Sequence, residues 1–213
     1  MKHSTLCVAL GLSLVVLIGC NDSGSSNESS NAVYSGVTQD DSGSTLGVQV
    51  ILESSQSPVL TLSDDRDHLT NYIGTQSGNS VTFSAAQLSC DTSSSTLQCQ
   101  SANGDVQLQK QPLAAQSVSD FEGSYQALWD ESLYSLTITA QGEVTLNGDQ
   151  CSLAGTLAES KPVENLIELN FASDDCGLGT IHAYAFLHVE NESLYSIDLL
   201  TDQPALPISW VRI

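Results

Sequence analysis

Apolar and polar residues alternate in short runs along most of this chain, and turn-forming residues separate the runs. An apolar residue at every second position is the spacing of a β-strand with one buried face, and helical spacing is almost absent. The pattern therefore predicts an all-β, antiparallel fold. The clearest runs are Val48/Val50/Leu52, Val81/Phe83, Tyr134/Leu136/Ile138, Ile167/Leu169/Phe171, Tyr195/Ile197/Leu199 and Leu206/Ile208/Trp210.

One hairpin can be predicted to the residue. A two-residue turn near Gly142 would pair Ile138 with Thr145 and place the apolar faces on opposite sides of the sheet. A three-residue loop that ends at Gly142 pairs Ile138 with Val144 instead, and it puts the glycine where a left-handed backbone is needed. Register and turn chemistry agree, so the three-residue loop is expected.

The chain is expected to form two β units, residues 33–112 and residues 119–213. The segment between them is small, polar and marked by Pro112. Each unit opens with an aromatic residue close to a glycine, Tyr34 near Gly36 and Tyr125 near Gly123, which hints at duplication. The alternative is one continuous barrel or sandwich built from both halves.

The first nineteen residues follow a different pattern. Lys2 precedes an apolar run from Leu6 to Ile18. This run is shorter than the ~20 residues that a helix needs to span the hydrocarbon core of a bilayer. A basic start followed by a short apolar run is typical of a signal peptide. The run ends in Leu17-Ile18-Gly19-Cys20, which resembles the lipobox of bacterial exported lipoproteins at all four positions.

This resemblance implies that residues 1–19 are removed and that Cys20 carries the lipid. In that family the cysteine thiol is diacylated and the new amino terminus is acylated, and stable anchoring needs at least two acyl chains. Residues 21–31 contain no apolar side chain, so residues 20–32 are expected to be a disordered tether. A plain secretory signal with a chance cysteine is the alternative.

The residues after Cys20 bear on the destination. In enteric lipoproteins, an Asp directly after the lipidated cysteine retains the protein in the inner membrane. Here that position is Asn21, and Asp22 follows it. By resemblance, the expected location is the cell envelope, at the outer membrane.

The chain is strongly acidic, with a formal net charge of −20. Such a surface is repelled by the phosphate backbones of nucleic acids and by anionic lipid headgroups. Nucleic acid is therefore not an expected partner. Membrane association is therefore expected through the lipid alone.

Four cysteines remain outside the signal and the anchor. An even number in an exported chain predicts disulfides, and spacing favours the local pairs Cys90–Cys99 and Cys151–Cys176. A zinc site is the competing interpretation, but the chain has no Cys-x-x-Cys pair and no histidine near either cysteine pair. No metal or other cofactor is predicted.

The second unit contains several motifs that recur together. They are Gly123-Ser124-Tyr125, Cys151-Ser152-Leu153-Ala154-Gly155-Thr156 and Cys176-Gly177. This set resembles a group of uncharacterised β-rich bacterial lipoproteins and carries no known activity. The fold expected for such a unit is a small up-and-down barrel of the lipocalin or avidin kind, with a sandwich as the alternative.

Candidate sites are few. No nucleophile elbow, phosphate loop or dinucleotide fingerprint occurs. The acidic stretch with Asp64, Asp65 and Asp67 is a weak candidate for Ca²⁺, because it lacks the EF-hand pattern and a solvated turn is the favoured interpretation.

One predicted strand has two different faces. Ile181, Ala183, Ala185, Leu187 and Val189 form a core face. The opposite face could line a ligand pocket or a partner surface, or could cover neighbouring strands. It carries His182, Tyr184, Phe186 and His188.

Taken together, these patterns predict a lipid-anchored, non-catalytic binding or assembly module of the envelope, with an envelope protein as a possible partner. A carrier of a small hydrophobic ligand inside a barrel is the second hypothesis, and an envelope enzyme is the third. A cavity would favour the ligand, and an exposed apolar patch would favour a protein partner.

Overall fold

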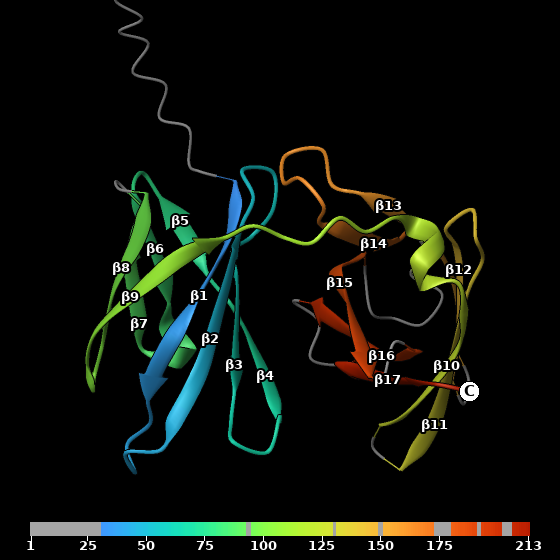
Figure 1. The fold of residues 1–213 in the computed structure, drawn as a ribbon, viewed down its shortest axis with the longest axis horizontal. Helices are drawn as coiled ribbons and strands as arrows, with labels where there is room; N and C mark the ends of the chain where they lie inside the picture. Colours follow the sequence, from blue (N-terminus) through green and yellow to red (C-terminus); the bar gives the residue numbers. More distant parts are fainter. Residues whose placement is uncertain are drawn as a thin grey trace, which may run out of the picture.

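The computed structural model describes residues 31–92, 95–129, 131–148, 151–172, 180–190, 193–201 and 206–213. The predicted signal peptide, the lipobox with Cys20 and residues 20–30 of the tether lie outside these residues. The described parts form antiparallel strands in two sheets, joined by one connecting segment (Figure 1). Within them, no helix has the length and apolar character that a membrane span requires.

The first sheet follows an up-and-down path that almost closes on itself. Its spatial order is β4-β3-β2-β1-β9-β8-β7-β6-β5, and the first strand pairs with the last, β1 with β9. The strands are β1 (Ala32–Gln39), β2 (Thr45–Leu52), β3 (Val59–Ser63), β4 (Leu69–Ile73), β5 (Thr75–Ser77), β6 (Ser80–Phe83), β7 (Leu88–Asp91), β8 (Thr96–Ser101) and β9 (Gly104–Gln111).

A single glycine separates the two edge strands of this sheet. Gly74 lies between β4, which pairs with β3, and β5, which pairs with β6. A Cβ atom at Gly74 would lie 2.7 Å from the ring of Phe83, so only glycine lets the chain bend here over the core. When β4 and β5 are counted as one strand that is kinked at Gly74, the sheet follows the path of an eight-stranded barrel. We call it the first barrel.

The second sheet is a closed barrel of eight strands in sequence order, in which β17 pairs with β10. The predicted fold class, all-β and antiparallel with two barrel-like units, is thus confirmed. The strands are β10 (Gly123–Trp129), β11 (Ser132–Ile138), β12 (Glu143–Asn147), β13 (Ser152–Glu159), β14 (Ile167–Phe171), β15 (Ile181–Glu190), β16 (Ser193–Thr201) and β17 (Ser209–Arg212).

The hairpin predicted near Gly142 has the expected register. Ile138 pairs with Val144, and the φ angle of Gly142 is 83°, in the left-handed region. The Gly142 N–H donates to the Thr139 carbonyl at 2.9 Å, and the Thr139 N–H donates to the Glu143 carbonyl at 2.9 Å. Local turn chemistry thus selected the register.

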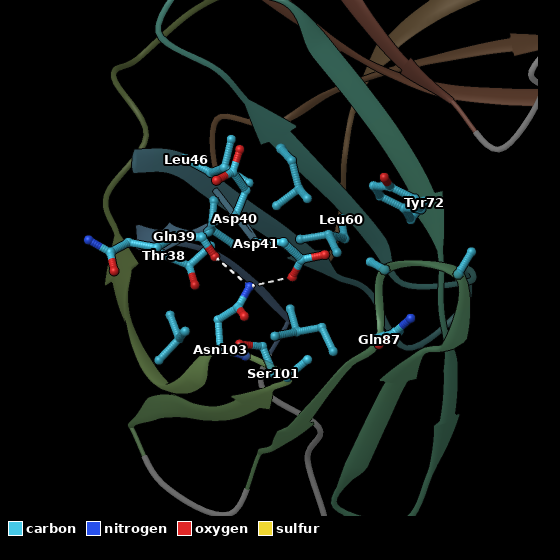
Figure 2. Close-up of a pocket in the computed structure, with 17 residues that line it drawn as sticks. Thr38, Gln39, Asp40, Asp41, Leu46, Leu60, Tyr72, Gln87, Ser101 and Asn103 are labelled. Atoms are coloured by element: carbon cyan, nitrogen blue, oxygen red, sulfur yellow. Dashed lines mark hydrogen bonds between the residues drawn. The ribbon is translucent and has the colours of Figure 1, made fainter. Parts of the chain in front are cut away.

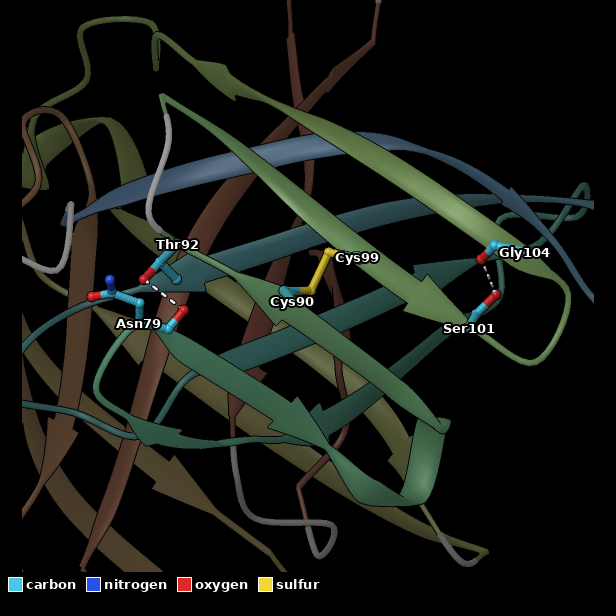
Figure 3. Close-up of a disulfide and its surroundings, with 6 residues drawn as sticks. All are labelled: Asn79, Cys90, Thr92, Cys99, Ser101 and Gly104. Atoms are coloured by element: carbon cyan, nitrogen blue, oxygen red, sulfur yellow. Dashed lines mark hydrogen bonds between the residues drawn. A yellow bond between two sulfur atoms is a disulfide. The ribbon is translucent and has the colours of Figure 1, made fainter.

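The predicted Cys90–Cys99 disulfide is present between β7 and β8 (Figure 3). The two cysteines are directly opposite each other in the ladder, and both side chains are buried in the first barrel. Cys151 is also disulfide-bonded. Its predicted partner Cys176 lies outside the described residues, so that pairing stays a prediction.

A third apolar cluster joins the outer surfaces of the two barrels. Val33, Ile51 and Val59 of the first barrel point away from their own core and pack in one cluster with Tyr184 and Leu200 of the second. At this interface Glu53 is only 3% exposed, and its carboxylate accepts a hydrogen bond from the Tyr184 hydroxyl at 3.0 Å.

The connecting segment is also held in place. The Gln116 side chain donates to the Asn165 carbonyl at 2.8 Å, and the Asn165 side chain donates to the Leu113 carbonyl at 3.1 Å. Leu113 packs against the inter-barrel cluster. The linker is therefore part of the interface between the barrels.

Candidate functional site

The interior of the second barrel is filled by large side chains. The 3₁₀ helix η2 (Val118–Phe121) inserts Phe121, which is fully buried. The Tyr125 hydroxyl donates to the Phe121 carbonyl at 2.7 Å, and the Trp210 indole donates to the Pro207 carbonyl at 2.9 Å. Buried aromatic groups with satisfied polar atoms are typical of a structural core.

The first barrel is packed at one end and open at the other. β1 begins with the buried residues Ala32, Val33 and Tyr34 and ends with the partly exposed Thr38 and the exposed Gln39. At the end where β1 finishes, a cavity of about 270 Å³ opens (Figure 2). We call this cavity the mouth.

The walls of the mouth come from interior-facing side chains near the strand ends and from η1 (Ser84–Ala86). None of the three η1 residues is buried, so this short helix borders the barrel without plugging it. The apolar lining residues are Leu46, Val48, Leu60, Leu62, Tyr72, Ala85, Ala86, Leu88, Ala102 and Val106, and the polar ones are Thr38, Gln39, Asp40, Asp41, Gln87, Ser101 and Asn103.

An acidic turn forms one side of the rim. The side chain of Asn103 donates to the Gln39 carbonyl and to Oδ1 of Asp41, both at 3.1 Å. In Figure 2 the Asp41 carboxylate points toward the middle of the ring of lining residues. Asn103 therefore holds a carboxylate over the mouth.

The neighbouring Asp40 has a different role. Its Oδ1 accepts hydrogen bonds from the Ser42 hydroxyl and from the Ser42 and Ser44 N–H groups, at 2.6, 2.8 and 2.9 Å. The hydroxyl bond from Ser42, followed by the N–H of Ser44, holds the pKa of Asp40 below its ordinary value. Asp40 thus shapes the turn and stays ionised.

The predicted calcium residues form a turn of the same kind. Oδ1 of Asp64 accepts the N–H groups of Arg66 and His68 at 2.8 and 2.9 Å, and Asp67 has a φ angle of 59°. The N–H of His68, then that of Arg66, lowers the pKa of Asp64. Among the described residues, no group of three or more His, Cys, Asp or Glu is placed to hold a metal ion.

The face with His182, Tyr184, Phe186 and His188 lies partly against the first barrel. Tyr184 is fully buried in the inter-barrel cluster, and Phe186 packs at its margin. Nε2 of His182 lies 3.5 Å from Oε2 of Glu168, while His188 is exposed. The side chain of Tyr184 is therefore not accessible to any other partner.

The opposite face of β15 was predicted to be a core face, and only part of it is buried. Ile181, Ala183 and Ala185 are fully buried inside the second barrel. A register shift between His188 and Val189 interrupts the alternation, and Val189 is 57% exposed. A β-bulge changes which face later residues occupy, and the alternation in the sequence did not reveal it.

The sequence did not identify the mouth. The sequence features that accompany this cavity are weak, because they are only small residues near the ends of strands, such as Thr38, Ala86 and Ala102. The inter-barrel surface had a clearer signal, because Ile51 and Val59 are apolar residues on outward-facing positions.

Comparisons with models of known protein families, with curated proteins and with solved structures find no match to this chain.

Proposed function

We propose that this chain is a lipid-anchored, non-catalytic lipoprotein of the cell envelope whose first barrel binds a small, mainly apolar ligand. The observation that carries the ligand proposal is the mouth, a cavity with apolar walls and a polar rim in one of two barrels that share the same strand path. The second barrel, which is filled, would act as a support for the first.

The size and walls of the mouth support a small ligand. Its volume of about 270 Å³ is just below the ~300–1,000 Å³ typical of pockets for drug-sized molecules. Leu46, Leu62 and Tyr72 are only partly buried there, so a ligand would remove their apolar surface from water. Burial of such surface is worth about 25 cal/mol per Å² before the costs of association.

The position of the mouth also fits an anchored protein. β1 begins at Ala32 and runs for eight residues toward the mouth. At about 3.3 Å per residue, the mouth is roughly 25 Å from the end of the barrel where the proposed tether would join. The tether and the mouth would thus be at opposite ends of the barrel.

Ligand binding can be tested with n-octanol as the probe. Calorimetric titration of the mature chain should show saturable binding, and NMR should show shifts of the Leu46 and Leu62 methyl groups. The variant Ala86→Trp, which fills the mouth, should lose this binding. The matched variant Ala154→Trp, on the outer face of the second barrel, should keep it. Unchanged binding in Ala86→Trp would overturn the proposal.

The anchor is tested separately. Cys20→Ser should move the protein from the membrane fraction to the soluble fraction of the envelope, because the acidic domain has no attraction of its own for anionic lipid. A variant that stays firmly in the membrane fraction would contradict lipid anchoring through Cys20.

A second candidate function, docking of an envelope protein, is favoured by an exposed apolar hairpin. Leu128 and Leu133 form a cross-strand pair and are 71% and 58% exposed, next to Trp129. Large exposed apolar side chains in one place mark interaction sites. Photocrosslinking from position 129 in cells should capture one partner, and the double variant Leu128→Ser, Leu133→Ser should abolish the crosslink.

A further inference from the structure

We infer that the mouth selects small amphiphiles with a positively charged head and an apolar tail, such as primary alkylammonium ions. This inference rests on the proposed ligand-binding function and adds the chemical class of the ligand.

The lining of the mouth carries charge of one sign only, as far as the described residues show. Asp40 and Asp41 are the charged groups of the mouth, and among the described residues no Lys, Arg or His side chain lines it. A cleft that carries one sign of charge above low-dielectric walls concentrates counter-ions of the opposite sign. The net charge of the whole chain, −20, acts in the same direction.

The two carboxylates of the mouth differ in their hydrogen bonding. Oδ1 of Asp40 is fully used by the turn, with three donors from Ser42 and Ser44. Asp41 accepts one hydrogen bond, from Asn103 to Oδ1, and its Oδ2 accepts none from the described residues. Oδ2 of Asp40 likewise accepts none from the described residues, but the Asp41 carboxylate points toward the middle of the lining residues (Figure 2). Asp41 is therefore the carboxylate placed to accept hydrogen bonds from an ammonium head.

The polar and the apolar lining groups come from different parts of the first barrel. Asp41 and Asn103 come from the loops at the rim, whereas the strands supply the apolar residues Leu60 and Leu62. An amphiphile with its tail between the strands would place its head beside Asp41. A fatty acid in the same position would bring two carboxylates together, which is unfavourable.

The test compares three probes with the same tail, n-octylammonium, n-octanol and n-octanoate, by calorimetry on the mature chain. The ammonium ion should bind about tenfold more tightly than the alcohol, and the carboxylate more weakly than either. Asp41→Asn should weaken ammonium binding about threefold to fivefold and leave octanol unchanged. Asp105→Asn removes the same charge from the outer face of the same barrel and should leave all three affinities unchanged.

The outcomes separate the two proposals. If none of the probes binds, both the ligand-binding function and this inference fail. If all three bind equally, or if octanoate binds best, the inference is overturned and the ligand-binding function stands. An equal loss in Asp41→Asn and Asp105→Asn would also overturn it, because the preference would then come from the general field of the protein. Added salt should reduce the preference for ammonium over octanol.

Discussion

The two barrels follow the same path with opposite results. In each, the strands run up and down in sequence order and the first pairs with the last, with nine strands in the first barrel, where Gly74 separates β4 from β5, and eight in the second. The second is closed and filled, whereas the first bends at Gly74 and opens into the mouth. The same topology therefore does not decide whether a barrel has room for a ligand. The side chains near the strand ends decide it.

The two 3₁₀ helices show this most directly. η2 buries Phe121 in its barrel, while η1 consists of Ser84, Ala85 and Ala86 and buries none of them. An aromatic residue closes one barrel, and two alanines leave the other open. Substitutions in each barrel test this difference.

Removal of the aromatic group should have the largest effect. Phe121→Ala should lower the free energy of unfolding of the second barrel by ~3–5 kcal/mol, because it leaves a cavity in a filled core. Leu62→Ala, in the mouth, should cost only about 1 kcal/mol, because that side chain is already partly exposed. Both tryptophans, Trp129 and Trp210, are in the second barrel, so their fluorescence in urea reports its unfolding. Amide hydrogen exchange reports the stability of the first barrel. If Phe121→Ala and Leu62→Ala lowered the free energy of unfolding of their barrels equally, the contrast between a filled and an open barrel would be contradicted.

Loss of the Cys90–Cys99 disulfide should affect the first barrel alone. The double variant Cys90→Ala, Cys99→Ala should cost about 2–3 kcal/mol on the chain-entropy estimate for a short loop. Amide exchange should increase in the first barrel and stay unchanged in the second. Peptide mapping of the unreduced wild type should also show Cys151 joined to Cys176, and a crossed pairing would refute the predicted register.

Two glycines in equivalent turns should differ in their tolerance of alanine. Gly43 and Gly142 have φ angles of 82° and 83°. A Cβ at Gly43 meets open space, whereas one at Gly142 would collide with the Leu157 carbonyl. Gly43→Ala should therefore cost about 1 kcal/mol from backbone strain, and Gly142→Ala about 2 kcal/mol. Urea denaturation curves of the two variants provide the measurement, and a reversed order would show that the turns are not equivalent.

The interface between the barrels should depend on pH. Burial, followed by the charge of Glu53, raises the pKa of Tyr184 above its ordinary value of 10.0. The unfolded chain ionises this tyrosine near pH 10 and the folded chain does not, so its contribution is intact below pH 10 and is lost as the pH rises above it. Tyr184→Phe should cost ~1–2 kcal/mol at neutral pH, because Oε2 of the buried Glu53 loses its donor while Oε1 keeps the hydrogen bond from the Ser55 hydroxyl. The variant should also lose less stability than the wild type above pH 10, and parallel pH profiles would contradict this role.

Calcium should have the smallest effect. Oδ1 of Asp64 is occupied by the N–H groups of its own turn. Millimolar Ca²⁺ should therefore leave the Tm of the protein unchanged in a thermal melt. A clear rise in Tm that Asp64→Asn abolishes would establish a calcium site at this turn.

The features that were predictable depend on neighbours in the sequence. The register at Ile138 and Val144 follows from a glycine that must be left-handed, and the Cys90–Cys99 pair follows from a short turn between facing strands. Alternation likewise identified Leu169 and Phe171 as core residues, because a strand places every second side chain on one face. The acidic clusters near Asp40 and Asp64 were ambiguous, because the same residues suit a metal and a turn.

Only the tertiary structure decided which outward faces are covered and which barrel is open. Alternation places Ile51 and Tyr184 on the outward faces of their own strands. It does not show that these two faces pack against each other, because the residues are far apart in the chain. The mouth likewise depends on how the ends of strands far apart in the chain, such as those that carry Leu46 and Val106, come together with η1. Local spacing determines turns, registers and one buried face per strand. Closure, filling and the contact between the barrels depend on the packing of distant strands, which a periodic pattern does not encode.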